Sequence, residues 1–397
     1  MARIAALAAV LVVIAAAALA FFLGAFTPTG AAPPATPTPS PAATASASPS
    51  ATPEATASPS PTPEPTPTPA PTPSLVAAPL SGRMVTPQVA QRHVIAVMVD
   101  DHPDARPQSG LASASVVWQA PAEGGIPRYM LLFQDTLPGN VGPIRSARSY
   151  FVAWAAEWDS LYAHVGGSPQ ALSTLKTYGN GKYVYDANQF YWGAYYWRIH
   201  TRIAPHNVYT DGTHLRSLAA RRGAKDGPIS SPWRFASDAP LLLRPRGGRI
   251  TVTYLYNKIT YDYDRFSNSY LRTVAGEGKQ HDADTKARIA PKNVVVMVVH
   301  FEPLNDGSHK GRLGADVIGT GTAWIATNGN TIKGTWKKTS STKPTEFFDA
   351  AGHAVTLTVG QTFIEVLPSA SDVSIKDGRD PLGSTNPLPL PGTVGEF

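Results

Sequence analysis

Residues His93–Asp101 have the sequence HVIAVMVDD, and this stretch decides the class of the fold. Its apolar run, which ends at Val99, has the length of one β-strand and does not alternate with polar residues. An uninterrupted apolar strand is typical of a strand that is covered on both faces of a sheet. Two aspartates, Asp100 and Asp101, follow it directly. The sequence therefore predicts a buried strand with polar side chains at its carboxyl end.

Strand and helix patterns interleave around this stretch, over residues 85–240. Further strands are predicted for ASVVWQA, RYMLLFQD and LYAHV, and a helix for RSARSYFVAWAAEW, in which aromatic residues recur at helical spacing. A second helix follows GGSPQ, with Ser168 as its N-cap, and a third is predicted to stop at Gly223. Residues 85–240 are thus expected to form a mixed α/β domain.

Residues 248–368 are almost entirely strand-like. In ITVTYLYNKITYDYD, large side chains recur at every second position, and the NGN sequence at Asn328–Asn330 predicts a hairpin between two further strands. We expect a mostly antiparallel β domain here, as a sandwich or a small barrel, which makes the whole fold α+β. Residues 369–397 are rich in proline and glycine and are expected to form a flexible tail.

The N-terminal quarter is built differently. Residues 1–26 contain a long run of apolar and small residues, preceded by a single charge at Arg3. At ~1.5 Å per residue, this run is long enough for a helix to cross a ~30 Å hydrocarbon core. A transmembrane anchor with a cytoplasmic N-terminus is therefore favoured over the alternative, a cleaved secretion signal. Residues 27–75 consist mainly of proline, threonine, serine and alanine, which predicts a disordered linker of polyproline character.

Composition limits the classes of function. The 397 residues include no cysteine, which excludes disulfides, thiolate metal sites and a lipid attached through a cysteine. The formal net charge is +6, and it is about +7 once Arg3, Glu54 and Glu64 of the N-terminal quarter are left out. This mild excess suits an anionic surface or wall polymer, but no dense basic run or nucleic-acid motif supports binding to nucleic acid.

Polar residues at strand ends and turns form the candidate chemistry. As acid, base or metal ligand the sequence offers Asp100, Asp101, Glu123, His164 and His206. For each, a structural role competes with the functional one: short acids cap turns, Glu123 can pair with a nearby arginine, and His164 can be a hydrogen-bonded core histidine. No metal or other cofactor is expected, because no strong metal or catalytic motif is present.

The stretch GPIRSARSYF, residues 142–151, places two arginines at the predicted start of a helix, where the dipole favours acids. Spaced i,i+3, Arg145 and Arg148 would share one helix face and grip a carboxylate, phosphate or sulfate, or else form surface salt bridges. An internal partner, Asp100 or Glu123, is the other possibility. The predicted ligand-binding set is Arg106, Arg128, Arg145, Arg148, Gly166, Gly167, Ser168 and Asn207.

These stretches together resemble the YerB-like lipoprotein family, a two-domain bacterial family without an established biochemical role. The resemblance rests on AVMVDDHPDARPQSGL, GGIPRYMLLFQ, VGPIRSARSYF, HVGGSP and RIAPHNVYT in the first domain, and on KNVVVM, GTGTAWIATNGNTIKGTWKK and GQTFIEV in the second. Two departures stand out. This chain lacks the cysteine that commonly carries the lipid, and Phe363 stands where similar sequences tend to have tryptophan. The resemblance implies two cooperating domains and no known reaction.

The sequence is compatible with three functions. The first is a membrane-tethered extracytoplasmic protein that binds an anionic cell-envelope polymer or a peptide carboxylate through the arginines. The second is an envelope hydrolase or transferase that uses the acids and histidines. The third is an assembly partner that works through an exposed apolar surface of the β domain.

Overall fold

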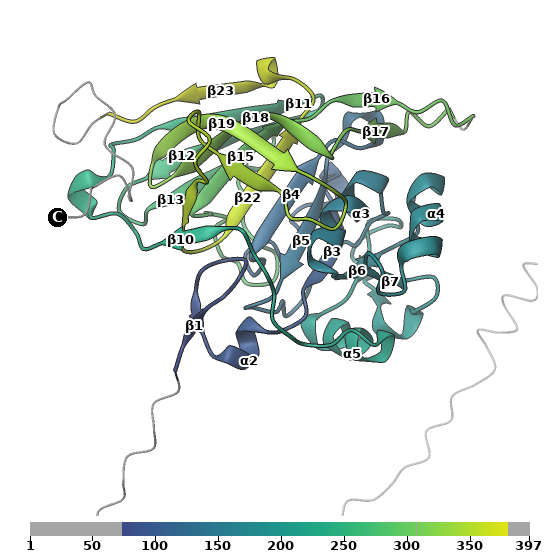
Figure 1. Ribbon diagram of the computed structural model, residues 1–397. Helices are drawn as coiled ribbons and strands as arrows, with labels where there is room; N and C mark the ends of the chain where they lie inside the picture. Colours follow the sequence, from purple (N-terminus) through teal and green to yellow (C-terminus); the bar gives the residue numbers. More distant parts are fainter. Residues whose placement is uncertain (1–73, 308, 380–397) are drawn as a thin grey trace, which may run out of the picture. The chain divides into compact units, whose positions relative to one another are not determined.

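The computed structural model describes residues 74–307 and 309–379 (Figure 1). The predicted anchor at 1–26 lies outside the described residues, as do nearly all of the linker at 27–75 and most of the tail. Within the part of the chain that is described, no helix is both long and apolar enough to cross a membrane.

A ten-stranded sheet runs through both halves of the described chain and forms the centre of the molecule (Figure 1). Its strands are, in spatial order, β20 (Glu346–Phe348), β19 (Asn330–Lys338), β18 (Gly319–Thr327), β15 (Asn293–Val298), β22 (Thr362–Leu367), β4 (Val116–Ala120), β5 (Arg128–Phe133), β3 (Ile95–Asp100), β6 (Leu161–His164) and β7 (Tyr185–Asn188). The halves join where β22 pairs in parallel with β4, so the two sequence segments complete one sheet.

A second, five-stranded sheet packs on one face of the first. It contains β14 (Gly278–Lys279), β13 (Ser269–Val274), β12 (Asn257–Asp264), β11 (Arg249–Tyr254) and β23 (Val373–Lys376), all paired antiparallel. The period-2 pattern places Ile250, Val252 and Tyr261 inward, where they share one core with Val294 and Phe363 of the large sheet. The mostly β composition expected for residues 248–368 is confirmed, and the two sheets lie face to face.

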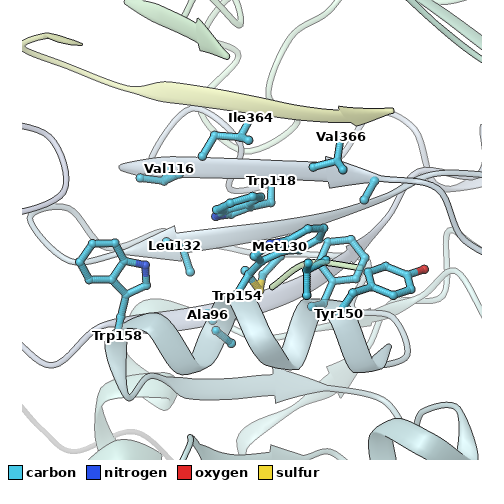
Figure 2. Packing of buried hydrophobic residues seen from close by; sticks show 14 of the residues in the cluster. Ala96, Val116, Trp118, Met130, Leu132, Tyr150, Trp154, Trp158, Ile364 and Val366 are labelled. Carbon is cyan, nitrogen blue, oxygen red and sulfur yellow. The ribbon is translucent and has the colours of Figure 1, made fainter. Parts of the chain in front are cut away.

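Helices and a second core cover the opposite face. Helix α3 (Ser149–Ala155) packs Trp154 against Trp118 of β4 (Figure 2). The two ring centroids are 4.6 Å apart, and the ring planes are inclined by 15°. The Tyr150 hydroxyl donates to the carbonyl of Pro121 at 2.6 Å. Strand β3 is therefore covered by α3 and its neighbours on one face of the large sheet and by other packed residues on the opposite face. Every residue of β3 is buried, as its apolar run predicts.

Capping residues fix the two longer helices as predicted. Helix α4 (Pro169–Tyr178) begins after Ser168, whose hydroxyl accepts from the Ala171 amide at 3.2 Å. Helix α5 (Gly212–Arg222) ends at Gly223, which adopts a left-handed φ of 84° that suits glycine. The remaining short elements are β1 (Val76–Ala77), β2 (Met84–Val85), α2 (Pro87–Ala90), β8 (Trp197–Arg198), β9 (Val208–Tyr209), β10 (Arg234–Ala236), β16 (Phe301–Pro303), β17 (Leu313–Ala315) and β21 (Thr356–Thr358).

Candidate functional site

Asp100, the last residue of β3, and Asp101, which follows it, point in opposite directions. Side chains alternate along a strand, so Asp100 lies on the α3 face, whereas Asp101 enters the space between the two sheets. Asp101 accepts hydrogen bonds from Gln119 Nε2 at 2.7 Å, Asn257 Nδ2 at 3.0 Å and Arg106 Nε at 3.1 Å. Burial raises the pKa of Asp101 to about 6, against the opposing charge of Arg106. The two acids therefore form no carboxylate pair.

Asp101 belongs to a buried polar network that the sequence interpretation missed. Gln119 links it to Arg272, whose Nε donates to the Tyr261 hydroxyl at 2.8 Å, and Arg272 lies 3.5 Å from the Glu365 carboxylate. Arg272 and Glu365 are both fully buried. The sequence does indicate this network, because an arginine, Arg272, stands at an inward position of the strand SYLRTV and a glutamate, Glu365, stands within the apolar strand TFIEVL. Because solvent does not reach these side chains, the network is a structural feature of the sandwich and offers no ligand site.

Asp100 organises a different, partly exposed cluster. Its Oδ2 lies 2.7 Å from His206 Nδ1 and 3.1 Å from Arg145 Nε, and its Oδ1 accepts from the His102 amide at 3.2 Å. The rings of His102 and His206 are stacked, with centroids 4.7 Å apart and planes at 22°. An ionised carboxylate only accepts, so it selects the tautomer of neutral His206 with the proton on Nδ1. The other ring nitrogen, Nε2, is left with a free lone pair.

Arg145 is not on a helix, and the prediction of a shared helix face with Arg148 is wrong. Helix α3 starts at Ser149, and Arg148, with φ −131° and ψ 150°, is its N-cap. The preceding segment is extended because Ile144 bridges Val99 and the Arg145 amide donates to Met98 at 2.9 Å. Among the described residues Arg145 has one ionic partner, Asp100, and its two terminal amino groups make no hydrogen bond.

Arg148 faces a different carboxylate, Glu123. Its Nε donates to Glu123 Oε2 at 2.9 Å, and Arg128 approaches the same oxygen at 3.4 Å. Arg312, which the sequence interpretation did not include, lies 3.8 Å from Oε1. Burial works to raise the pKa of Glu123, but the hydrogen bond and charge of Arg148 hold it below its ordinary value. Burial, followed by the charge of Arg148, lowers the pKa of Arg128 to about 10.

The Gly-rich turn before α4 is occupied by the protein itself. His164 is fully buried, and its ring nitrogens lie 2.7 Å from the Gly166 carbonyl and 2.8 Å from Asp186 Oδ1. The Gly166 amide donates to Asn188, and the Ser168 amide donates to Ala147. Neither His164 nor the amides of Gly166 and Ser168 are available to a ligand. Gly167 forms a bridge with Ala147 that fixes the turn against the Arg145 segment.

Arg106 and Asn207 shape the loops that carry the histidines. Arg106 is bound to Asp101 through its side chain and to the Asp101 carbonyl at 3.0 Å. Asn207 accepts from Arg198 at 2.6 Å and donates to backbone carbonyls. Arg202 donates to the carbonyls of Ala105 and Pro107, at 2.6 and 2.7 Å. These contacts bind the 199–207 loop to the 103–107 turn and so bring His206 beside His102.

Six of the predicted site residues therefore form two neighbouring clusters, and the others lie outside them. One contains Asp100, Arg145 and His206, and the other contains Glu123, Arg128 and Arg148. They are adjacent because Asp100 and Arg128 are register partners on β3 and β5. Sequence reasoning missed His102, although it stands beside Asp104 in the motif DDHPDARP, and it interpreted Asp104 mainly as an acid that caps the turn. Two hollows of about 740 and 760 Å³ lie elsewhere, and neither is lined by Asp100, Arg145 or His206.

The fold is that of a mostly β protein in which two sequence segments share one ten-stranded sheet. Its candidate site contains a cluster of polar side chains around the buried carboxylate of Asp100. The chain belongs to the family described as "Protein of unknown function (DUF3048)". The model of the family's N-terminal domain matches residues 80–225, and that of its C-terminal domain matches residues 250–364.

A named relative agrees with this assignment. The chain is 32% identical over 309 residues to "Putative lipoprotein YerB" of Bacillus subtilis (strain 168), an alignment that covers 76% of this chain and 89% of the relative. The crystal structure of the YerB protein from Bacillus subtilis matches with a TM-score of 0.68 at 29% identity, over 76% of this chain and all of that one. The resemblance predicted from the motifs is confirmed.

Proposed function

We propose that this protein is a membrane-tethered extracytoplasmic protein that binds an anionic component of the cell envelope, with Arg145 as the main contact. One observation carries the proposal: no side-chain nitrogen of Arg145 makes a hydrogen bond within the described chain, and its ion pair there joins Nε to Asp100 at 3.1 Å. The side chain is 25% exposed. A guanidinium whose N–H groups are not used inside the protein offers a planar fork that suits a carboxylate or phosphate.

The surrounding charges favour an anion over a cation at this fork. Glu123 is enclosed by three arginines, and the Asp100 charge is shared between Arg145 and His206. Guanidinium groups therefore outnumber carboxylates where the two clusters meet. The described part of the chain also belongs to the segment with a net charge of about +7. Such an excess raises the local concentration of a polyanion such as a wall polymer.

The tether and the location rest on other grounds. The apolar run and the proline-rich linker of the first 75 residues favour an anchor and a spacer. The relative in Bacillus subtilis carries the word lipoprotein in its name, which is consistent with a membrane-attached protein outside the cytoplasm. In this chain an apolar helix would replace the lipid, because the sequence has no cysteine to carry one.

The test is retention of the full chain on isolated cell wall, before and after its anionic polymers are removed. We expect Arg145→Ala to reduce retention at least tenfold. Arg221→Ala, which removes an equal charge from the exposed end of α5, should leave retention within twofold of the wild type. Equal retention of the Arg145 variant and the wild type, or equal losses in the two variants, would refute the proposal.

A hydrolase or transferase is the second candidate, and the pair of Asp100 and His206 favours it. A histidine whose Nδ1 is held 2.7 Å from a carboxylate is oriented to accept a proton on Nε2. His206→Gln should then abolish turnover of wall fragments by the purified protein. Turnover that survives this substitution excludes His206 as the base.

The assembly hypothesis also has one supporting observation. The side chains of Leu242 and Phe266 are 74% and 78% exposed. The two segments that carry them are close together, because Arg265 donates a hydrogen bond to the Leu241 carbonyl at 2.5 Å. Exposed apolar side chains in one place are typical of protein contacts. A photo-crosslinker at position 242 should give a discrete adduct in cells if this surface is used, and none if it is not.

A further inference from the structure

We propose that His102, Asp104 and His206 form a binding site for a zinc ion. The three side chains offer one ligand atom each, and these atoms all lie within 4.8 Å of one another. They come from two loops, the turn after β3 and the loop before β9, which the contacts of Arg202 hold together. The site shares Asp100 with the ion pair of Arg145, but Arg145 is not one of its ligands, and the proposal stands whether or not Arg145 binds an anion.

His206 already has the arrangement of a metal-binding histidine. Metal-bound imidazoles usually donate their second ring N–H to a carboxylate or a carbonyl, which fixes the tautomer and orients the ring. Here Asp100 accepts from Nδ1 at 2.7 Å, and Nε2 is the nitrogen left for a metal. Asp100 is itself held by Arg145 and by the His102 amide. The His206 ring is thus oriented before any ion binds.

His102 and Asp104 lie at a separation that suits shared coordination. Around one tetrahedral zinc ion, with bonds of about 2.0–2.2 Å, neighbouring ligand atoms are roughly 3.4 Å apart. The distance from His102 Nδ1 to Asp104 Oδ2 is 3.5 Å. The Asp104 side chain is 73% exposed and free to rotate. His102 Nδ1 accepts a hydrogen bond from the Asp104 amide at 3.2 Å, and the His102 ring is stacked on that of His206, so zinc binding requires His102 to give up this bond and to turn out of the stack.

The ligand types select the metal. Two imidazoles and one carboxylate suit zinc, whereas calcium and magnesium prefer sets made entirely of oxygen. Three protein ligands leave a fourth position of a tetrahedral ion open. The site is on the surface, which leaves that position accessible to water or to an external ligand. The positive charge of the ion also offsets Asp104, which has no arginine or lysine partner within the described chain.

The experiment is a titration of the full-length protein in detergent, carrying no polyhistidine tag, with zinc chloride in a calorimeter. We expect one ion per chain. His206→Ala and His102→Ala should each weaken binding at least tenfold. Asp100→Asn, which removes the orienting carboxylate without touching a ligand, should weaken it about tenfold or more.

His353 provides the matched control. It forms another histidine–aspartate contact, with Asp349 at 3.3 Å, but its side chain is 80% exposed and lacks a second histidine. His353→Ala should leave the zinc affinity unchanged. Cobalt chloride provides an independent probe, because its visible absorption should show a low-coordinate site in the wild type that is absent in the His206 variant.

Each result decides the proposal. Zinc should raise the melting temperature of the wild type, since a ligand that binds only the folded state stabilises it, and should not raise that of the His206 variant. This comparison also shows that the variant is folded. The absence of saturable binding, or a His206 variant that binds like the wild type, overturns the site. So does a His353 variant that loses as much affinity as the His206 variant. Loss of wall retention in Arg145→Ala, measured in the presence of chelator, reports on the proposed function alone.

Discussion

Asp100 and Asp101 are consecutive residues whose carboxylates lie on opposite faces of the ten-stranded sheet. Asp100 meets His206 and Arg145 at the partly exposed rim, whereas Asp101 accepts from Gln119 and Asn257 in the interior between the sheets. The period of two along a strand produces this division. One position is accessible to ligands, and the other holds the sandwich together.

The two aspartates should respond differently to the same substitution. Asp101→Asn replaces an acceptor by a donor in a buried place where the neighbours already donate, so we expect a loss of about 2–4 kcal/mol in the free energy of unfolding. Asp100→Asn should cost less than about 1.5 kcal/mol, because His206 and Arg145 can reach solvent. Urea denaturation at pH 7 measures both. A larger loss for Asp100 than for Asp101 would contradict this division of roles.

The buried pair of Arg272 and Glu365, which joins the two sheets, should be far more sensitive to substitution than an exposed pair within the five-stranded sheet. Removing one member leaves the other charged and buried, so Glu365→Ala should cost about 3–5 kcal/mol. The cross-strand pair of Arg249 and Asp262 is the control: its side chains are 55% and 39% exposed, and Arg249→Ala should cost less than about 1 kcal/mol. Similar losses from the two substitutions, measured by urea denaturation, would show that the network contributes no more than a surface contact.

Glu123 should make stability depend on pH in the acid range. Arg148 and its neighbours hold the pKa of Glu123 below its ordinary value, so the folded state favours the ionised form. The stabilisation is fully present above the ordinary pKa of a glutamate and is lost as the pH falls through the lower, folded value. Glu123→Gln should therefore lower the free energy of unfolding by about 1.5–3 kcal/mol at pH 7, and the difference from wild type should shrink towards pH 3. Glu302→Gln, on the exposed strand β16, should show no such trend.

Local patterns in the sequence predict which helices and strands form. They predict less well which of these elements pack or pair with one another. The alternation in β11 and the N-cap at Ser168 are encoded by adjacent residues, and both were correctly predicted. The pairing of Val116 with Thr362 joins residues far apart in the chain, and neither strand carries a local signal for its partner. The helix expected from Arg145 onward failed for the same reason, because bridges from distant strands hold that segment extended.

The candidate site shows the same limit. The types of residue were predictable, since acids and arginines at strand ends stand out in the sequence. Their partners were not predictable: Arg145 and Arg148, three residues apart, face the different carboxylates of Asp100 and Glu123. His102 was overlooked because its role depends on His206, which a separate loop brings next to it.

Substitutions of Arg145 and Arg148 should separate a loss of ligand binding from a loss of folding stability. Arg148 is enclosed with Glu123, and Arg148→Ala leaves that carboxylate without its main partner, so we expect a loss of about 2–4 kcal/mol in the free energy of unfolding. Arg145→Ala should change stability by less than about 1 kcal/mol, because the partly exposed side chain makes a single ion pair. Arg145→Lys keeps the charge but loses the planar fork, and it should recover less than half of wall retention if the ligand is gripped at two points. Full recovery with lysine would show that charge alone is recognised, and a stability loss in Arg145→Ala as large as that in Arg148→Ala would identify Arg145 as a structural residue.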